Sequence, residues 1–173
     1  MKKEKSFIRD VIEVLVTVIV ITFILTKFIL MPCMVNGTSM YPTLHDNDRV
    51  YSFIITKNLG IKRFDICVIS AFNTDAEEKL LVKRVIGMPN ETVEYKDNKL
   101  YINGEYVEED FLNDTTTNDF TVTLGEDEYY CLGDNRVVSR DSRYYGPFKK
   151  DVILATNIFV IYPFANFGVK KWV

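Results

Sequence analysis

The chain opens with one long apolar run and continues with short apolar runs separated by polar, turn-forming segments. The long run covers residues 11–31, VIEVLVTVIVITFILTKFILM, and its only charged residues are Glu13 and Lys27. At about 1.5 Å per residue, a helix of this length reaches roughly 30 Å, the thickness of the hydrocarbon core of a bilayer. The two charged side chains lie toward opposite ends of the run, where they can reach the headgroups. The pattern predicts one membrane-spanning helix.

The flanks of this run indicate a retained anchor and its orientation. A cleavable secretory signal has a shorter apolar region and a small-residue cleavage site, and the segment MPCMVNGTS at the end of the run offers none. Residues 1–10 carry four basic and two acidic side chains, whereas the first stretch after the run is nearly uncharged. Because a Lys/Arg excess stays in the cytoplasm, we expect residues 1–10 inside, 11–31 across the cell membrane and 32–173 outside.

Residues 32–173 have the pattern of a mostly β domain. Apolar and β-branched runs of strand length alternate with turn signals, without sustained helical periodicity. Asn103-Gly104 predicts a two-residue hairpin turn, and the polar stretch 111–120 predicts a surface loop. We expect strands at residues 50–55, 64–70, 80–86, 91–95, 99–102, 120–124, 128–132 and 155–162.

Charge and composition argue against some functions for the outer part. The formal charge of −3 divides into +2 on residues 1–10, zero on the anchor and −5 on residues 32–173. An acidic outer domain disfavours nucleic acid as a partner. One histidine and no paired ligand spacing give little support to a zinc site. The three cysteines lack Cys-x-x-Cys spacing and leave at least one unpaired: Cys33, Cys67 and Cys131.

The segment GTSMYPTL, residues 37–44, places a serine, Ser39, shortly after the anchor. A serine in such a segment is usually a turn residue, and to attack a carbonyl it needs a base within hydrogen-bond reach. The one histidine, His45, lies six residues away beyond a proline, where local chain geometry does not aim it back at Ser39. A Ser-His-Asp triad is therefore disfavoured, and we expect His45 to be a solvated loop residue.

A neutral lysine is the other known base, and it needs burial or nearby positive charge to lower its pKa from about 10.4. Lys83 has an apolar strand setting in LLVKRVIGMP, and the adjacent Arg84 would project to the opposite face of the strand. A lone lysine in such a strand is more often a guard on the edge of a sheet. The residues around Lys83 leave both interpretations open.

A third segment, CLGDNRVVSRDSRYYGPF at residues 131–148, gathers polar and charged side chains. It is either a charged loop held by Asp-Arg pairs or the support of a site, in which one hydroxyl orients the lysine amine. In order and spacing, GTSMYPTL, KRVIGMP and GDNRVVSRDSRYYGPF behind an N-terminal anchor resemble bacterial type I signal peptidase, in the short form typical of Gram-positive organisms. The resemblance covers most of the chain, and the combination of motifs is specific.

The resemblance implies a role for each matching residue. Ser39 would be the nucleophile and Lys83 the general base of a Ser-Lys dyad. Ser139 would hydrogen-bond to the Lys83 amine and position it, while Asp141 and Arg143 would brace the loop. We expect no cofactor and no metal. The remaining motif residues would shape the site: Gly37, Met40, Pro42, Arg84, Gly133, Asp134 and Asn135.

The resemblance also implies a fold and an activity. The family fold is a mostly antiparallel β domain, related to that of self-cleaving repressors, with an apolar surface resting on the membrane. The family removes N-terminal signal peptides from exported preproteins after small residues, at A-x-A-like sites, through an acyl-enzyme. Activity should rise with pH as Lys83 loses its proton.

The resemblance leaves the stabilisation of the oxyanion partly open. The Ser39 backbone N–H would be one donor. Gly37 stands where some members carry a hydroxyl side chain, which leaves the second donor to Thr38 or another backbone amide.

Two further departures from the family pattern lie after Pro89 and before Ser139. Asn90-Glu91 follows Pro89 where the family often has Gly-Asp, and asparagine tolerates a left-handed turn position. Val137-Val138 replaces a polar pair before Ser139, which would either alter how Ser139 is presented or make the site drier.

There are two alternatives, one among enzymes and one from a different functional class. A self-cleaving repressor shares the Ser-Lys chemistry, but the apolar run of residues 11–31 argues against it. A membrane-tethered, non-catalytic assembly factor or chaperone, for example for pilins, has no need of Ser39 and Lys83 together. The sequence does not separate a general secretory peptidase from one dedicated to a few substrates such as pilins, so a secretion translocon and pilus assembly components both stay open as partners.

Overall fold

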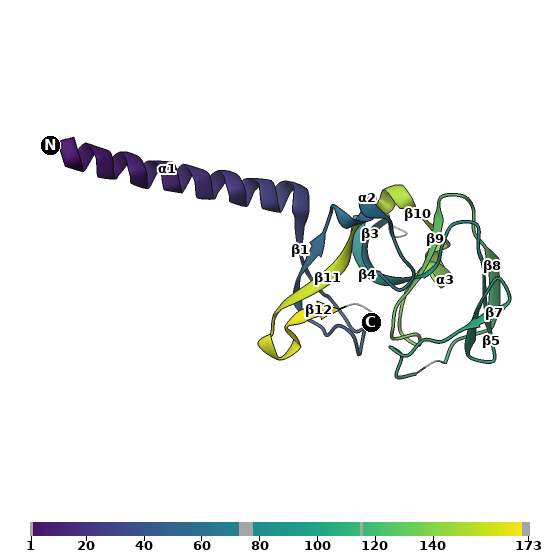
Figure 1. Cartoon of the computed structure of the whole chain (residues 1–173). Helices are drawn as coiled ribbons and strands as arrows, with labels where there is room; N and C mark the ends of the chain where they lie inside the picture. The colour runs from purple at the N-terminus through teal and green to yellow at the C-terminus, as the bar shows by residue number, and fades with distance from the viewer. Residues whose placement is uncertain (1, 73–77, 115, 171–173) are drawn as a thin grey trace.

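The computed structural model describes residues 2–72, 78–114 and 116–170, which form one long helix and a β domain (Figure 1). The helix α1, Lys2–Ile24, continues as a short π-helix, η1, Leu25–Ile29. The segment Phe7–Ile29 has a mean hydropathy of 2.4 and is not buried by the rest of the described chain, and by its length and composition it is able to cross a membrane.

The apolar run expected to end the helix at Met31 is divided between the helix and a strand. Leu30 and Met31 belong to β1, Leu30–Met34, which pairs antiparallel with β2, Arg49–Phe53. The Ile54 N–H also donates a 2.9 Å hydrogen bond to the Ile29 carbonyl. The end of the helix is therefore fixed by long-range backbone pairing, which hydrophobic periodicity does not report.

The main sheet has eight strands in the order β1-β2-β11-β3-β4-β9-β10, with β12 paired to β11, and all pairs are antiparallel. Because β4 lies between β3 and β9, Lys83 is on a central strand, and the edge-guard interpretation is wrong. The other strands of the sheet are β3 Ile66–Phe72, β4 Glu78–Gly87, β9 Glu128–Leu132, β10 Phe148–Lys149, β11 Ile153–Tyr162 and β12 Gly168–Lys170.

A second sheet of four antiparallel strands, in the order β7-β6-β5-β8, lies on the side of the domain away from α1 (Figure 1). Asn103 and Gly104 join β6 to β7 with φ angles of 52° and 85°, so the predicted two-residue hairpin is confirmed. Residues 111–119 lie outside the strands, although Thr115 is not among the described residues. The strands of this sheet are β5 Thr92–Lys96, β6 Lys99–Ile102, β7 Glu105–Val107 and β8 Phe120–Thr123.

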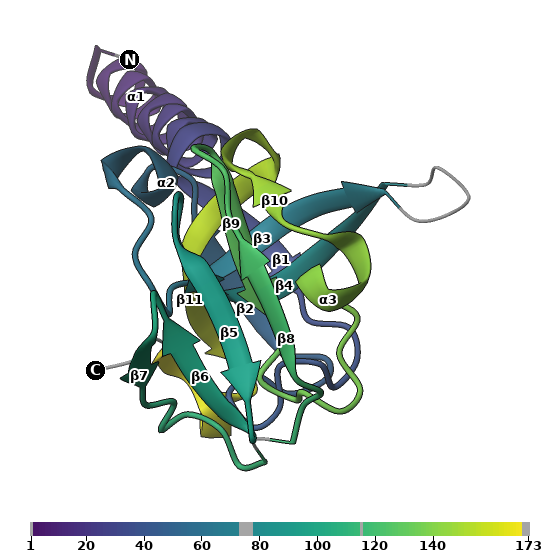
Figure 2. The ribbon, with the colours of Figure 1, turned by 90° about the vertical axis from the view of Figure 1, so that its right-hand side faces the viewer.

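The short helices lie at the ends of strands. The paired strands β3 and β4 extend beyond the rest of the main sheet, with α3 beside them (Figure 2). The predicted mostly β, antiparallel fold behind one apolar helix is confirmed, and each expected strand begins and ends within two residues of its expected bounds. The short helices are α2 Thr56–Leu59, α3 Ser142–Tyr145, η2 Lys150–Val152 and η3 Phe164–Asn166.

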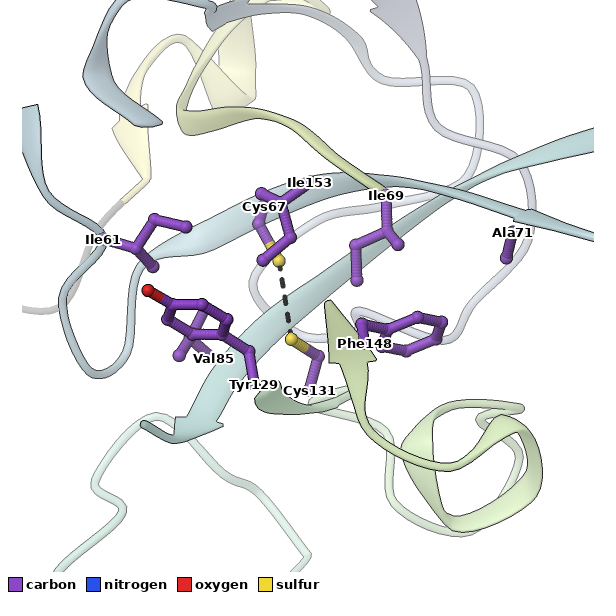
Figure 3. Packing of buried hydrophobic residues seen from close by; sticks show 9 residues of the cluster. All are labelled: Ile61, Cys67, Ile69, Ala71, Val85, Tyr129, Cys131, Phe148 and Ile153. Atoms are coloured by element: carbon purple, nitrogen blue, oxygen red, sulfur yellow. Dashed lines mark hydrogen bonds between the residues drawn. The ribbon is translucent and has the colours of Figure 1, made fainter. Parts of the chain in front are cut away.

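One hydrophobic cluster packs on the face of the main sheet that is shared by β3, β9 and β11. Cys67 and Cys131 point toward each other at its centre, with their Sγ atoms 3.8 Å apart (Figure 3). Both thiols are fully buried, and burial is the main reason why the pKa of Cys131 is raised. All three cysteines, Cys33 included, are free thiols.

Candidate active site

Ser39 lies in the connection between β1 and β2, on a turn that is held in place by buried apolar side chains. Met40 and Leu44 are fully buried, and the Leu44 N–H donates to the Met40 carbonyl at 2.9 Å. Gly37 has a φ of +87°, a region that glycine enters without strain, and its N–H donates to Asp46 at 2.6 Å. The motif thus buries Met40 and leaves the neighbouring Ser39 partly exposed.

Lys83 reaches Ser39 from the middle of β4. Its Nζ lies 2.7 Å from Ser39 Oγ and donates to the Val82 carbonyl at 2.9 Å. Only 3% of Lys83 is exposed, and this burial lowers the pKa of its amine, against the opposing effect of the Asp141 carboxylate. A buried amine with a lowered pKa, in contact with a hydroxyl, is the arrangement that a lysine base requires.

Arg84, the next residue of β4, is buried in a different environment. Its Nε and Nη2 donate to the two carboxylate oxygens of Asp134 at 2.8 and 2.7 Å, and its Nη1 donates to the Phe64 carbonyl at 2.9 Å. The guanidinium carbon lies 4.1 Å from the centre of the Phe111 ring. The Thr43 hydroxyl donates to Asp134 at 2.5 Å and accepts from Arg84 at 3.2 Å. This network joins the three sequence motifs behind the site.

Gly133 and Asn135 hold the backbone of the serine. The Asn135 N–H donates to the Ser39 carbonyl at 3.0 Å. A Cβ on Gly133 would collide with the Ser39 carbonyl oxygen and with Ser139 Oγ, so only glycine allows this approach. Sequence reasoning placed both residues in the motif but could not foresee that they contact the nucleophile's own peptide group.

Asp141 and Arg143 form a two-hydrogen-bond ion pair in the last motif. Arg143 Nε and Nη2 each donate to the carboxylate at 2.8 Å, and the Gly133 N–H donates to it at 3.0 Å. Burial acts to raise the pKa of Asp141, but the hydrogen bonds from Arg143 and Gly133 outweigh it, and the pKa is lowered. Asp141 also caps α3 by accepting from the Arg143 N–H. The carboxylate therefore stays charged and fixes the loop.

A second buried arginine attaches the same loop to the four-stranded sheet. Arg136 Nη2 lies 2.6 Å from Glu109 Oε1, and the Tyr95 hydroxyl hydrogen-bonds to both side chains. Sequence reasoning did not identify Glu109 or Tyr95, because they are far from the motif in the chain. A tyrosine at a buried position of an alternating strand was the one available signal.

Ser139 does not make the contact expected of it. Its Oγ is buried and has no hydrogen-bond partner among the described residues, and it lies against Gly133 beside the Ser39 carbonyl. The expected hydrogen bond from Ser139 to Lys83 is therefore not formed in this structure. The lysine amine is held instead by Ser39 Oγ and the Val82 carbonyl.

The two valines before Ser139 do not enter the buried part of the site. Val137 and Val138 are 65% and 57% exposed, and Val138 lines the groove beside Ser39. The turn after Pro89 matches expectation, because Asn90 has a φ of +65°. Glu91 then accepts two hydrogen bonds from Arg63.

His45 is turned away from the serine. Its Nδ1 lies 3.1 Å from Asn166 Nδ2 and 3.9 Å from Asp48 Oδ2, and its ring packs edge-on against Tyr41. No hydrogen bond joins His45 to Ser39 in the described part of the chain, so the structure gives no support to a Ser-His-Asp triad.

A groove runs past the Ser39–Lys83 pair. A cavity of about 390 Å³ beside the pair is lined by residues 34–40, by residues 79–83 of β4, and by Val138, Arg140 and Tyr145. A second cavity of about 660 Å³ shares residues of both segments and continues along β1 to Pro32 and Cys33. An extended peptide laid between β1 and β4 would pass directly over Ser39.

Comparison with known proteins identifies the family. The family described as "Signal peptidase, peptidase S26" matches residues 8–162. The chain belongs to the signal peptidase family. This confirms the resemblance drawn from the three motifs, and it makes the protein a serine peptidase by family.

Individual signal peptidases are similar over nearly the whole chain. Signal peptidase I S of Bacillus subtilis is 38% identical over 175 residues, covering 93% of this chain and 92% of its own. Signal peptidase IB of Staphylococcus aureus is 36% identical, covering 95% and 94%. The crystal structure of a signal peptidase I from Enterococcus faecalis is 38% identical with a TM-score of 0.50, covering 56% of this chain and 95% of the other.

Proposed function

We propose that this protein is a membrane-bound signal peptidase I that cuts signal peptides from exported preproteins, with Ser39 as nucleophile and Lys83 as general base. The observation that carries this proposal is the 2.7 Å contact between Ser39 Oγ and the Nζ of a buried lysine whose pKa is lowered. The family and its signal peptidase I relatives support the substrate class.

The chemistry follows from the pair. Neutral Lys83 takes the Ser39 proton as Oγ attacks the scissile carbonyl, and the resulting ammonium returns that proton to the leaving amine. Ser39 is then acylated by the signal peptide, and Lys83 activates the water that hydrolyses the ester. The Asp141 carboxylate favours the transient ammonium electrostatically, because it acts to raise the lysine pKa.

The oxyanion that forms during attack needs preorganised donors. The Ser39 N–H donates no hydrogen bond within the described residues, so it is available as the first donor. The Gly37 N–H is engaged by Asp46. This leaves Thr38, which is exposed and adjacent to the nucleophile, as the candidate for the second.

The proposed membrane topology has the basic N-terminus in the cytoplasm, the helix across the cell membrane and the β domain outside. The excess of basic residues before the apolar run supports this orientation. The groove would then lie on the same side of the membrane as a translocated preprotein, whose small-residue cleavage site follows its own apolar segment.

The test is cleavage of a purified preprotein with an A-x-A site, in liposomes, by the wild type, Ser39→Ala and Lys83→Ala. Mass spectrometry locates the cut, and Lys149→Ala, which removes an exposed lysine of β10, serves as the matched control. We expect the wild type and the control to cut after the last alanine, and both site variants to fall by at least about 10³-fold while remaining folded by circular dichroism.

The opposite result would identify a scaffold. If all four proteins are inactive on a range of preproteins, and Ser39→Ala still supports secretion or surface assembly in cells, the chain acts as a non-catalytic assembly factor. The peptidase assignment would then be wrong.

A further inference from the structure

The groove beside Ser39 is positively charged in a domain that is otherwise acidic. Residues 32–173 carry a formal charge of −5. The cavity at the Ser39–Lys83 pair is nevertheless lined by two cations, Lys79 and Arg140, besides Lys83, and no aspartate or glutamate is among the described residues that line it. Lys83 is accounted for by the proposed chemistry, which leaves two cations without a role.

Arg140 differs from the other two arginines of its loop. Arg136 is paired with Glu109 and Arg143 with Asp141, each at hydrogen-bond distance. No carboxylate pairs with Arg140 within the part of the chain that the structure describes, and its guanidinium carbon lies 5.6 Å from the centre of the Tyr144 ring. Arg136 and Arg143 thus stabilise this segment through internal ion pairs, whereas Arg140 is exposed and lines the groove.

The groove has a direction relative to the proposed anchor. Its far cavity runs along β1 to Pro32, two residues after the strand begins at the end of the helix. Val138, Arg140 and Tyr145 line the near cavity and not the far one. The apolar segment of a signal peptide lies in the bilayer on the N-terminal side of its cleavage site. The signal peptide would therefore approach along β1, and the first residues of the mature protein would leave past Arg140.

We propose that Arg140 makes this enzyme prefer substrates with an acidic side chain at the first or second position after the cut. The inference rests on the proposed function and adds a charge preference to it. A guanidinium without an internal partner pairs with a substrate carboxylate without breaking an existing ion pair, and it repels a lysine at the same place. The nearby Tyr144 ring restricts where the guanidinium lies, which reduces the entropy lost on binding.

The test uses one preprotein with an A-x-A site and glutamate, glutamine or lysine at the first or second mature position. The measured quantity is kcat/KM for each substrate with the wild type, Arg140→Gln, Arg140→Glu and the control Lys149→Gln. We expect the wild type and the control to favour glutamate over lysine by about threefold or more, as for one partly exposed ion pair. The ratio should fall to about one in Arg140→Gln and invert in Arg140→Glu, and high salt should weaken it in the wild type.

Failure of this inference is distinguishable from failure of the proposed function. If the wild type cuts all three substrates equally, or if Arg140→Gln keeps the preference, the charge assignment is wrong while cleavage that depends on Ser39 stands. Binding of the same substrates to Ser39→Ala, measured as Kd by fluorescence anisotropy, examines the preference without catalysis. Equal affinities for the glutamate and lysine substrates there would overturn the proposal even if no preprotein is cut.

Discussion

Lys83 and Arg84 are consecutive residues of one central strand, and both are almost completely buried, at 3% and 1% exposure. Successive side chains of a strand point to opposite faces, so the two cations enter different environments. Arg84 meets a carboxylate in a two-hydrogen-bond pair, a backbone carbonyl and an aromatic ring. Lys83 meets a hydroxyl and a backbone carbonyl.

The difference explains why one cation supports the structure and the other is suited to react. A buried charge is stabilised by a directly bonded opposite charge, and Arg84 has one in Asp134. Lys83 has no directly bonded carboxylate among the described residues. Burial therefore disfavours its charged form more than the nearby negative charges favour it, and its pKa is lowered. One strand therefore positions a permanent cation and, beside it, an amine that can lose its proton.

The largest expected effect comes from removing the reactive member of the pair. Lys83→Met keeps the length of the side chain and removes the amine, so kcat should fall by at least about 10³-fold with the fold intact. Lys83→Arg should be equally inactive, because a guanidinium does not deprotonate in proteins. Preprotein cleavage and near-UV circular dichroism measure the two properties. Substantial activity in Lys83→Arg would break the distinction between the two cations.

Removing the structural member should affect stability more than any other single change in this pair. Arg84→Met leaves Asp134 buried without its partner, which costs about 3–5 kcal/mol, or roughly 10 °C in Tm. The double variant Arg84→Met/Asp134→Leu replaces the whole ion pair with apolar side chains and should recover much of the loss. Thermal unfolding followed by circular dichroism measures both. A single variant as stable as the wild type would contradict the structural role of Arg84.

A smaller loss of stability is expected when the Thr43 hydroxyl, which links the serine motif to the Arg84–Asp134 ion pair, is removed. Thr43→Val removes the hydrogen bond to Asp134 without changing the side chain's volume, and the expected cost is about 1–3 kcal/mol. Chemical denaturation gives the free energy of unfolding. Thr43→Ser keeps the hydroxyl, loses only the methyl group and measures the cost of packing alone. A Thr43→Val variant as stable as the wild type would contradict the contribution of the hydrogen bond.

The smallest expected effect is on the pH dependence of stability. The pKa of Lys83 is lower in the folded protein than in the unfolded chain, so between the two values the unfolded chain binds more protons and stability rises with pH. Lys83→Met should therefore be more stable than the wild type near neutral pH, and its advantage should shrink as the pH rises toward the ordinary lysine value. The nearby carboxylates offset part of the burial penalty, which keeps the effect small. A gain that does not vary with pH would indicate a packing effect.

The apolar pattern around Lys83 and Arg84 was enough to place both on one strand with opposite orientations. It could not decide between an edge and a central strand, because that depends on the pairing of β4 with β3 and β9. The same limit applies to the start of the domain. Leu30 and Met31 look like membrane residues, and only their pairing with β2 assigns them to a strand.

The site was predictable where a motif carries its own chemistry and unpredictable where the contact is a matter of side-chain rotation or backbone proximity. Ser39 and Lys83 were candidates from their segments, and the resemblance of the three motifs together gave them their roles; the structure brings their side chains together. The Ser139 hydroxyl is turned toward Gly133. This position depends on the side-chain rotamer, which the sequence does not determine. The contact of Asn135 with the Ser39 carbonyl is made by backbone atoms, on which residue identity gives little information.

The strand β1 separates the end of the helix from the turn that carries the nucleophile by a fixed length. Its five residues span about 17 Å at roughly 3.3 Å per residue, and pairing with β2 prevents it from coiling or stretching. β1 runs across the axis of α1 (Figure 1), so under the proposed topology this strand is a spacer that fixes how far the serine turn lies to the side of the helix. A preprotein whose small residues emerge at another distance from the helix would then escape cleavage, however well they fit the groove.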